Sequence, residues 1–123
     1  MFRPVLLSLS LLLAPALPAL ADDGFARIDD KAKFRGTGQG RELRYGAFGI
    51  RLQVEPDGQI RGRALGWAIT GKWDWKDGYF CREMDWSGME IDYNCQLVEA
   101  QGAEKLRFTV DQGAGDSAVF RLR

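Results

Sequence analysis

The sequence predicts an all-β domain, a small antiparallel up-and-down β-barrel of seven or eight strands with a short N-terminal helix. Apolar and polar residues alternate from Arg41 to the C-terminus, and turn residues recur every eight to twelve positions. The segments between these turns are too short for the helical crossovers of a parallel sheet. Closure into a barrel removes unpaired strand edges, so we favour a barrel over the alternative, a two-layer β-sandwich.

The first 21 residues have the three parts of a secretion signal. Arg3 provides the positive charge, residues 5–13 form an apolar run, and Ala19 and Ala21 are the small residues before a cleavage site. Pro15 and Pro18 interrupt the apolar run before the roughly 20 residues that a membrane-spanning helix needs. We therefore expect a signal peptide at 1–21, a single domain at 22–123, and a periplasmic or secreted location.

A short helix is predicted at the start of the domain. Residues 25–34 carry apolar side chains at helical intervals, and Asp29 or Asp30 can cap the helix. The glycines at 36, 38 and 40 are expected to end it. Their spacing differs from the Gly-x-Gly-x-x-Gly fingerprint of dinucleotide sites, which also follows a strand and opens a helix.

Turn residues divide the remaining chain into strands. Strands are expected after Arg41 and at 50–54, 60–64, 67–75, 79–86, 91–99, 105–110 and 118–123. Pro-Asp-Gly at 56–58, Asp-Gly at 77–78 and Ser-Gly at 87–88 are turn sequences. The small residues Gly62 and Ala64 predict a crowded or strongly bent strand.

The two cysteines, Cys81 and Cys95, predict one disulfide, because an exported chain meets an oxidising environment. Each lies seven residues from Gly88, so a hairpin that turns at Gly88 places them face to face. The bridge would close a loop of about fifteen residues, for which the loop-entropy model gives roughly 3 kcal/mol. The hairpin turn already restricts this loop, so we expect a smaller contribution.

The alternation around the cysteines contains a conflict. The more apolar face of the second cysteine strand, which we assign to the interior, carries Ile91, Tyr93, Cys95 and Leu97. If Cys81 also faces inward, the interior receives Tyr79, Glu83 and Asp85, and the outer face receives Phe80, Met84 and Trp86. Two explanations stay open. Either inward carboxylates lie near the barrel mouth beside Arg61, Arg63 or Arg107, or a β-bulge near Glu83 reverses the alternation.

Aromatic residues are densest in the middle of the chain, where they comprise Trp67, Trp73, Trp75, Tyr79, Phe80, Trp86 and Tyr93. Such side chains serve either as core or as the wall of a binding site. Both readings stay open for Trp73 and Trp75, which share one face of a strand. The candidate ligand-binding residues are Trp73, Trp75, Tyr79, Glu83 and Trp86.

Charge and composition exclude several functions. The chain has 17 basic and 17 acidic residues, and loss of a signal peptide containing Arg3 leaves 16 and 17, a net charge of −1. This balance gives no reason to expect nucleic acid or an anionic membrane as partner. The chain has no histidine, the commonest general base and metal ligand. We expect no metal, no cofactor and no catalytic residue, although the carboxylates of Glu83, Asp85, Glu90 and Asp92 cluster as glycosidase carboxylates do.

Five segments resemble a family of small exported bacterial proteins that are often labelled dihydrodipicolinate reductase. They are Gly-Arg-Ala-Leu-Gly-Trp at 62–67, Trp-x-Trp at 73–75, Asp-Gly-Tyr-Phe-Cys-Arg-Glu at 77–83, Asn-Cys-Gln at 94–96 and Phe-Thr-Val-Asp at 108–111. That reductase is a larger two-domain protein with a nucleotide-binding fold, whereas this chain lacks its length and its fingerprint. The resemblance therefore implies a location and a shape, and it transfers no catalytic residue.

These observations together predict a binding protein that is not an enzyme. The partner would be a small ligand or an envelope protein, held at the barrel end near the cysteine hairpin. The alternative is an inhibitor or accessory of an envelope enzyme, similar in form to a lysozyme inhibitor.

Overall fold

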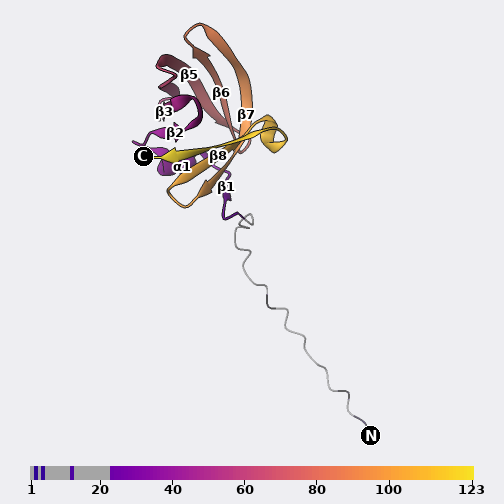
Figure 1. Ribbon diagram of the computed structural model, residues 1–123. Coiled ribbons are helices and arrows are strands. Elements are labelled where there is room, and N and C mark those ends of the chain that lie inside the picture. Colours follow the sequence, from indigo (N-terminus) through magenta and orange to yellow (C-terminus); the bar gives the residue numbers. More distant parts are fainter. Residues whose placement is uncertain (1, 3, 5–11, 13–22) are drawn as a thin grey trace.

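The computed structural model describes residues 2, 4, 12 and 23–123, so the predicted signal peptide lies almost wholly outside the described residues. Residues 23–123 form one compact body of nine strands, one α-helix and two short 3-10 helices (Figure 1). Within the described part of the chain, no helix combines the length and the apolarity needed to span a membrane.

Eight of the strands close into an antiparallel barrel, which confirms the predicted fold class. In chain order they are β2 (Leu43–Tyr45), β3 (Ile50–Val54), β4 (Gln59–Ala64), β5 (Trp67–Lys76), β6 (Tyr79–Trp86), β7 (Met89–Gln101), β8 (Lys105–Thr109) and β9 (Ser117–Leu122). Each strand pairs with the next along the chain, and β9 pairs with β2 to complete the circle. The 3-10 helices are η1 (Ala47–Gly49) and η2 (Asp111–Gly113).

Two-residue turns join the central strands at the predicted positions. Asp77 and Gly78 connect β5 to β6 with φ of 52° and 85°, and Ser87 and Gly88 connect β6 to β7 with φ of 49° and 96°. Two successive positive φ values match the twist of antiparallel strands, and glycine accepts such values without strain. The third such turn, between β4 and β5, has Leu65 in the first position.

Close contact between backbones explains the predicted crowding of β4. A Cβ atom on Gly62 would lie 1.9 Å from the carbonyl oxygen of Arg51 on β3. A Cβ atom on Gly71 of β5 would lie 2.5 Å from the carbonyl oxygen of Glu83. Glycine therefore allows the sheet to bend sharply at both positions.

The N-terminal segment differs from the prediction. Residues Ala26–Ile28 form a strand, β1, which pairs with β7 at positions 98–100. Because β7 extends past the start of β6, it leaves a free edge that β1 covers. Helix α1 (Lys31–Gly38) follows, capped by the Asp30 side chain, which accepts a hydrogen bond from the Lys33 amide at 2.7 Å. The helix runs through Gly36, so that glycine does not end it.

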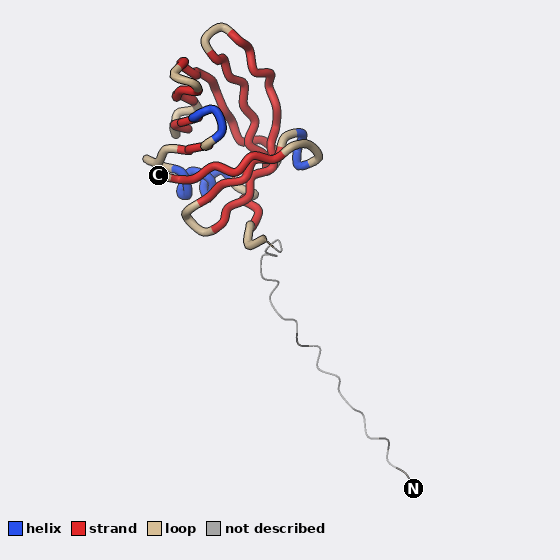
Figure 2. Tube along the Cα trace, viewed as in Figure 1, coloured by secondary structure: helices blue, strands red, loops and turns tan. Residues whose placement is uncertain are grey.

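Helix α1 closes one end of the barrel (blue in Figure 2). Its Phe34 is 3% exposed and packs against the rings of Trp73, Trp75, Phe80 and Phe108 at centroid distances of 5.2–6.4 Å. The indole of Trp73 also donates a hydrogen bond to the Glu55 carbonyl at 2.7 Å. These aromatic rings fill the α1 end of the interior.

A polar cluster fixes the start of the described domain to the barrel. The guanidinium of Arg107 on β8 bonds both carboxylate oxygens of Glu99, each at 2.9 Å, and also contacts the Asp23 carboxylate. Its Cζ atom lies 4.2 Å from the ring centroid of Phe25. The hydrogen bond from Arg107 lowers the pKa of Asp23 below its ordinary value. The N-terminal segment is thus held by a charge pair and an aromatic contact.

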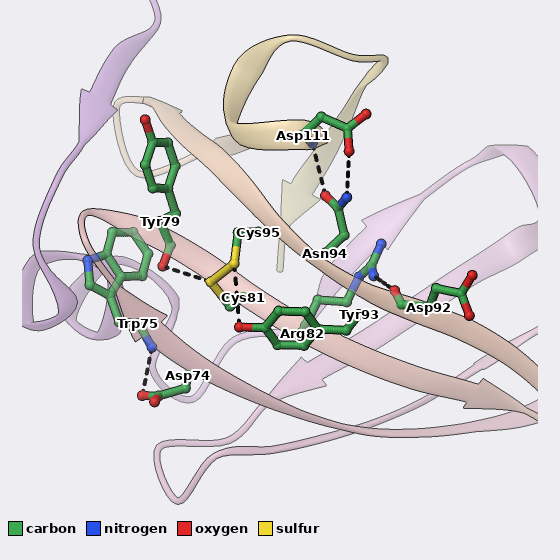
Figure 3. Close-up of a disulfide and its surroundings, with 10 residues drawn as sticks. All are labelled: Asp74, Trp75, Tyr79, Cys81, Arg82, Asp92, Tyr93, Asn94, Cys95 and Asp111. Carbon is green, nitrogen blue, oxygen red and sulfur yellow. Dashed lines mark hydrogen bonds between the residues drawn. A yellow bond between two sulfur atoms is a disulfide. The ribbon is translucent and has the colours of Figure 1, made fainter.

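Cys81 and Cys95 are direct partners across β6 and β7, and their sulfur atoms are 2.12 Å apart. This confirms the predicted disulfide and its position in the hairpin. Figure 3 shows the bridge between Tyr79 and Tyr93, whose hydroxyl lies 3.5 Å from the Cys95 sulfur.

The cysteines lie on the face of the β6–β7 hairpin opposite to that of Phe80, outside the core cluster, although Cys81 is only 1% exposed. Their assignment to the barrel interior was therefore wrong. Residues Phe80, Met84 and Trp86 pack on the core instead. The predicted bulge near Glu83 is present, because the register shifts between the pairs Arg82–Asn94 and Met84–Ile91. Two residues of β7 therefore oppose one residue of β6, and the alternation in β7 reverses at that point.

Candidate functional site

An apolar cavity of about 270 Å³ lies inside the barrel, beyond the aromatic rings that fill the α1 end. Its wall contains aliphatic and aromatic side chains from strands around the barrel, namely Leu43, Leu52, Val54, Ile60, Phe80, Met84, Phe108, Val110, Ala118 and Phe120. The volume lies near the lower end of the range for small-molecule sites, roughly 300–1,000 Å³.

The inner faces of β4 and β5 carry residues of very different size. On β4 and β5 the inward positions include Gly62 and Gly71, which contribute no side chain. The large inward residue Trp73 lies at the α1 end of β5, where it packs on Phe34. The bulk of the inner face of β5 is thus at the α1 end, and the cavity lies beyond it, whereas Gly62 and Gly71 lie against the backbones of β3 and β6 and do not line the cavity.

Arg82 places a positive charge in the cavity wall. Its side chain is half-buried, and its Nη1 atom donates a hydrogen bond to the Asp92 carbonyl in the bulge at 2.7 Å (Figure 3). Within residues 23–123, no carboxylate lies within 4.0 Å of its guanidinium nitrogens. Burial lowers the pKa of Arg82, but a guanidinium keeps its proton in proteins. The remaining N–H groups of Arg82 are available to an acceptor.

Three further polar residues line the cavity. Gln96 is 6% exposed and lies opposite Phe80 across β6 and β7. Asp116 and Ser117 lie at the start of β9 and are exposed to solvent. The site thus has an apolar body, two polar side chains within its wall, and a solvated polar edge.

Three of the five predicted ligand-binding residues belong to the barrel interior and lie outside the cavity lining. Trp73 is 6% exposed and packs at the α1 end. Trp75 stacks on Phe34, and its buried Nε1 atom has no hydrogen-bond partner among the described residues. Trp86 packs on the core at the other end of the barrel, where its Nε1 atom donates to the Ala64 carbonyl at 3.0 Å.

The other two predicted residues, Tyr79 and Glu83, are away from the interior. The Tyr79 ring lies under the guanidinium of Arg27 at 5.0 Å. Glu83 is exposed in an outer groove over β5, β6 and β7, together with Asp85, Glu90 and Asp92. No group of three or more possible ligand side chains within the described residues is arranged to hold a metal ion. The structure therefore does not bring the five candidates together.

Sequence reasoning missed Arg82, Gln96 and Met84 as lining residues. The alternation of residues along β6 could have identified them, if Phe80 had been assigned to the inner face instead of Cys81. Phe80, Arg82 and Met84 follow each other at intervals of two, and they share the inner face of β6.

The fold and the cavity define this protein as a small antiparallel β-barrel with a largely apolar internal pocket that opens away from its helix. Comparisons with protein-family models, curated proteins and solved structures find no match for this chain. The resemblance to the family labelled as reductases stays a prediction.

Proposed function

We propose that this protein is a periplasmic or secreted binding protein that holds one small, largely apolar molecule in its barrel and performs no chemistry on it. The apolar cavity of about 270 Å³ carries this proposal. An eight-stranded barrel has an interior just wide enough to be filled by side chains or to hold one small ligand. Here the side chains around Phe34 fill one end of the barrel, and the apolar side chains beyond them can contact a ligand.

The polar groups of the wall indicate the chemistry of the ligand. The planar guanidinium of Arg82 matches a carboxylate, which accepts two parallel hydrogen bonds from it. Gln96 offers an amide to the same ligand. Asp116 also lines the cavity, but its side chain is exposed, so solvent screens its charge more than that of half-buried Arg82. We therefore propose a short amphiphile with an apolar chain and a carboxylate.

Titration calorimetry with decanoate and with its uncharged analogue decanol tests the proposal. Both chains should bind, and decanoate should bind more tightly. Arg82→Gln should weaken decanoate binding at least tenfold, because one charged hydrogen bond contributes roughly 1.5–3 kcal/mol and a tenfold change is about 1.4 kcal/mol. The same substitution should leave decanol binding nearly unchanged.

A matched pair of substitutions tests whether the chain enters the barrel. Ala118 lines the cavity, whereas its neighbour Val119 is 38% exposed on the outer face. Ala118→Phe should abolish binding of both compounds, and Val119→Phe should not. The proposal is wrong if neither compound binds the native protein, or if folded Ala118→Phe protein binds as well as native protein.

A further inference from the structure

Five basic side chains stand in register across five adjacent strands on the outer face of the barrel. Lys105 pairs with Arg121, Arg121 with Arg44, Arg44 with Arg51, and Arg51 with Arg63. Four of the five are exposed and Lys105 is partly so. We call these five residues the basic row. Neighbouring strands lie about 4.8 Å apart, so the charges are close to one another.

The fold alone does not account for the basic row. Like charges directly opposite one another destabilise an antiparallel pair. Among the described residues, one member has an ion-pair partner, since Arg44 contacts Glu42 at 2.7 Å. The acidic residues Glu83, Asp85, Glu90 and Asp92 gather over β5, β6 and β7 instead. The net charge is near zero, but the basic row and this acidic group lie on different strands of the barrel.

An exposed apolar group adjoins one end of the basic row. Phe48, Leu65 and Trp67 are 63%, 58% and 64% exposed, and we call them the apolar tip. The Leu65 amide donates to the Phe48 carbonyl at 2.9 Å, so these two residues are neighbours. Arg63 joins the row to the tip, because its Nη1 atom donates to the Gly66 carbonyl at 3.1 Å.

The backbone at the apolar tip favours other residues than those present. Leu65 has φ of 50° and Phe48 has φ of 63°, a region that bulky side chains rarely adopt. The equivalent position is Asp77 in the β5–β6 turn and Ser87 in the β6–β7 turn, and both are polar. Leu65 is exposed, so it does not stabilise the core, and its positive φ does not favour the turn. We therefore expect a role of this side chain at the surface.

We propose that the apolar tip and the adjoining part of the basic row, Arg44, Arg51 and Arg63, dock the barrel on an anionic membrane surface. Basic side chains are attracted to anionic headgroups, and adjoining aromatic and aliphatic side chains enter the headgroup region. The tip lies at the Trp67 end of β5, whereas α1 packs at the Trp73 end. Docking therefore brings the end of the barrel remote from α1 to the membrane.

Co-sedimentation with lipid vesicles tests this proposal. The full-length mature protein should bind vesicles of equal parts phosphatidylcholine and phosphatidylglycerol, and it should not bind phosphatidylcholine alone. Binding should weaken as salt is added. Arg51→Glu should lower the partition coefficient at least tenfold, since it changes the charge by two units. Each unit near such a surface contributes about 1 kcal/mol, and tenfold is about 1.4 kcal/mol.

Two variants separate docking from folding. Lys33→Glu makes the same change of charge on α1, where Lys33 is exposed, and should alter binding no more than about twofold. Leu65→Asn places a preferred residue in the turn, so it should raise the melting temperature and still weaken vesicle binding several-fold. Trp67→Phe should remove the blue shift of tryptophan fluorescence that anionic vesicles produce.

Failure to bind anionic vesicles at low salt would overturn the proposal. Undiminished vesicle binding by Arg51→Glu, or by Leu65→Asn, would also overturn it. Binding of double-stranded DNA as tight as the binding of anionic vesicles, with no loss in Leu65→Asn, would overturn the proposal and assign the basic row to a polyanion. These outcomes are independent of decanoate binding, so each proposal stands or fails separately.

Discussion

Single residues decide which side chains reach the interior of this barrel. Glu83 opposes two residues of β7, and this one extra position reverses the alternation, so that Gln96, Val98 and Ala100 face the interior while Cys95 and Leu97 do not. The same bulge places the Asp92 carbonyl where Arg82 bonds it. The sequence predicted the bulge as one of two alternatives. It could not choose between them, because a cysteine pair can face either side of a sheet.

Also at the residue scale, the contact between Asp23 and Arg107 predicts a pH effect on stability. The pKa of Asp23 is lowered in the folded protein, so its stabilising contribution is present above its ordinary pKa of about 3.8 and is lost as the pH falls below it. Asp23→Asn should therefore have a lower melting temperature than native protein at pH 7, with the difference vanishing at acidic pH. Melting curves that differ equally at every pH would contradict this prediction.

At the scale of elements, turn chemistry and alternation were enough to predict most of the strands. The turns at Asp77-Gly78 and Ser87-Gly88 lie where expected, and β3 occupies the predicted residues. The N-terminal element was mistaken because Ala26–Ile28 has no strong pattern of its own. It is a strand because β7 is longer than β6 and has an edge to be paired. Such an override by tertiary pairing is not visible in local sequence.

Two glycine substitutions test the account of how β4 and α1 are built. Gly62→Ala should destabilise the protein by about 1–3 kcal/mol or more, because its Cβ atom would meet the Arg51 carbonyl oxygen at 1.9 Å. Gly36→Ala should stabilise it by roughly 0.5–1 kcal/mol, because Gly36 lies within α1 with no atom within 4 Å of an added Cβ. Urea unfolding measures both. Equal effects of the two substitutions would refute the proposed bend in the sheet.

At the scale of the whole molecule, closure and the disulfide were predictable, and the position of the cavity was not. The number of strands and the cost of open edges favour a barrel. The cavity depends on which side chains the register turns inward and on Phe34 closing one end. The five predicted ligand-binding residues were selected for aromatic density and, in the case of Glu83, for a possible inward carboxylate. The core uses Trp73, Trp75 and Trp86. The residues that line the cavity are mostly aliphatic residues and phenylalanines, with Arg82 and Gln96 among them.

The separation of charge is likewise a property of the whole molecule. The five basic residues, Arg44, Arg51, Arg63, Lys105 and Arg121, are spread over 78 positions of sequence. Closure of the barrel brings them into one row. The amino-acid composition counts these basic residues together with the acidic residues, and the resulting net charge is near zero. Only the pairing of β9 with β2 connects Arg121 to Arg44. A net charge near zero therefore does not exclude a strongly charged surface.

Methionine methyl NMR shows directly whether the barrel interior takes up a small amphiphile, as we propose. Beyond residue 21 the chain has two methionines, Met84 in the cavity wall and Met89, which is 60% exposed. We expect added decanoate to shift the Met84 methyl signal in a saturable way and to leave the Met89 signal nearly unchanged. A Met84 signal that does not move while decanoate is shown to bind, or that moves no more than the Met89 signal, would contradict the account.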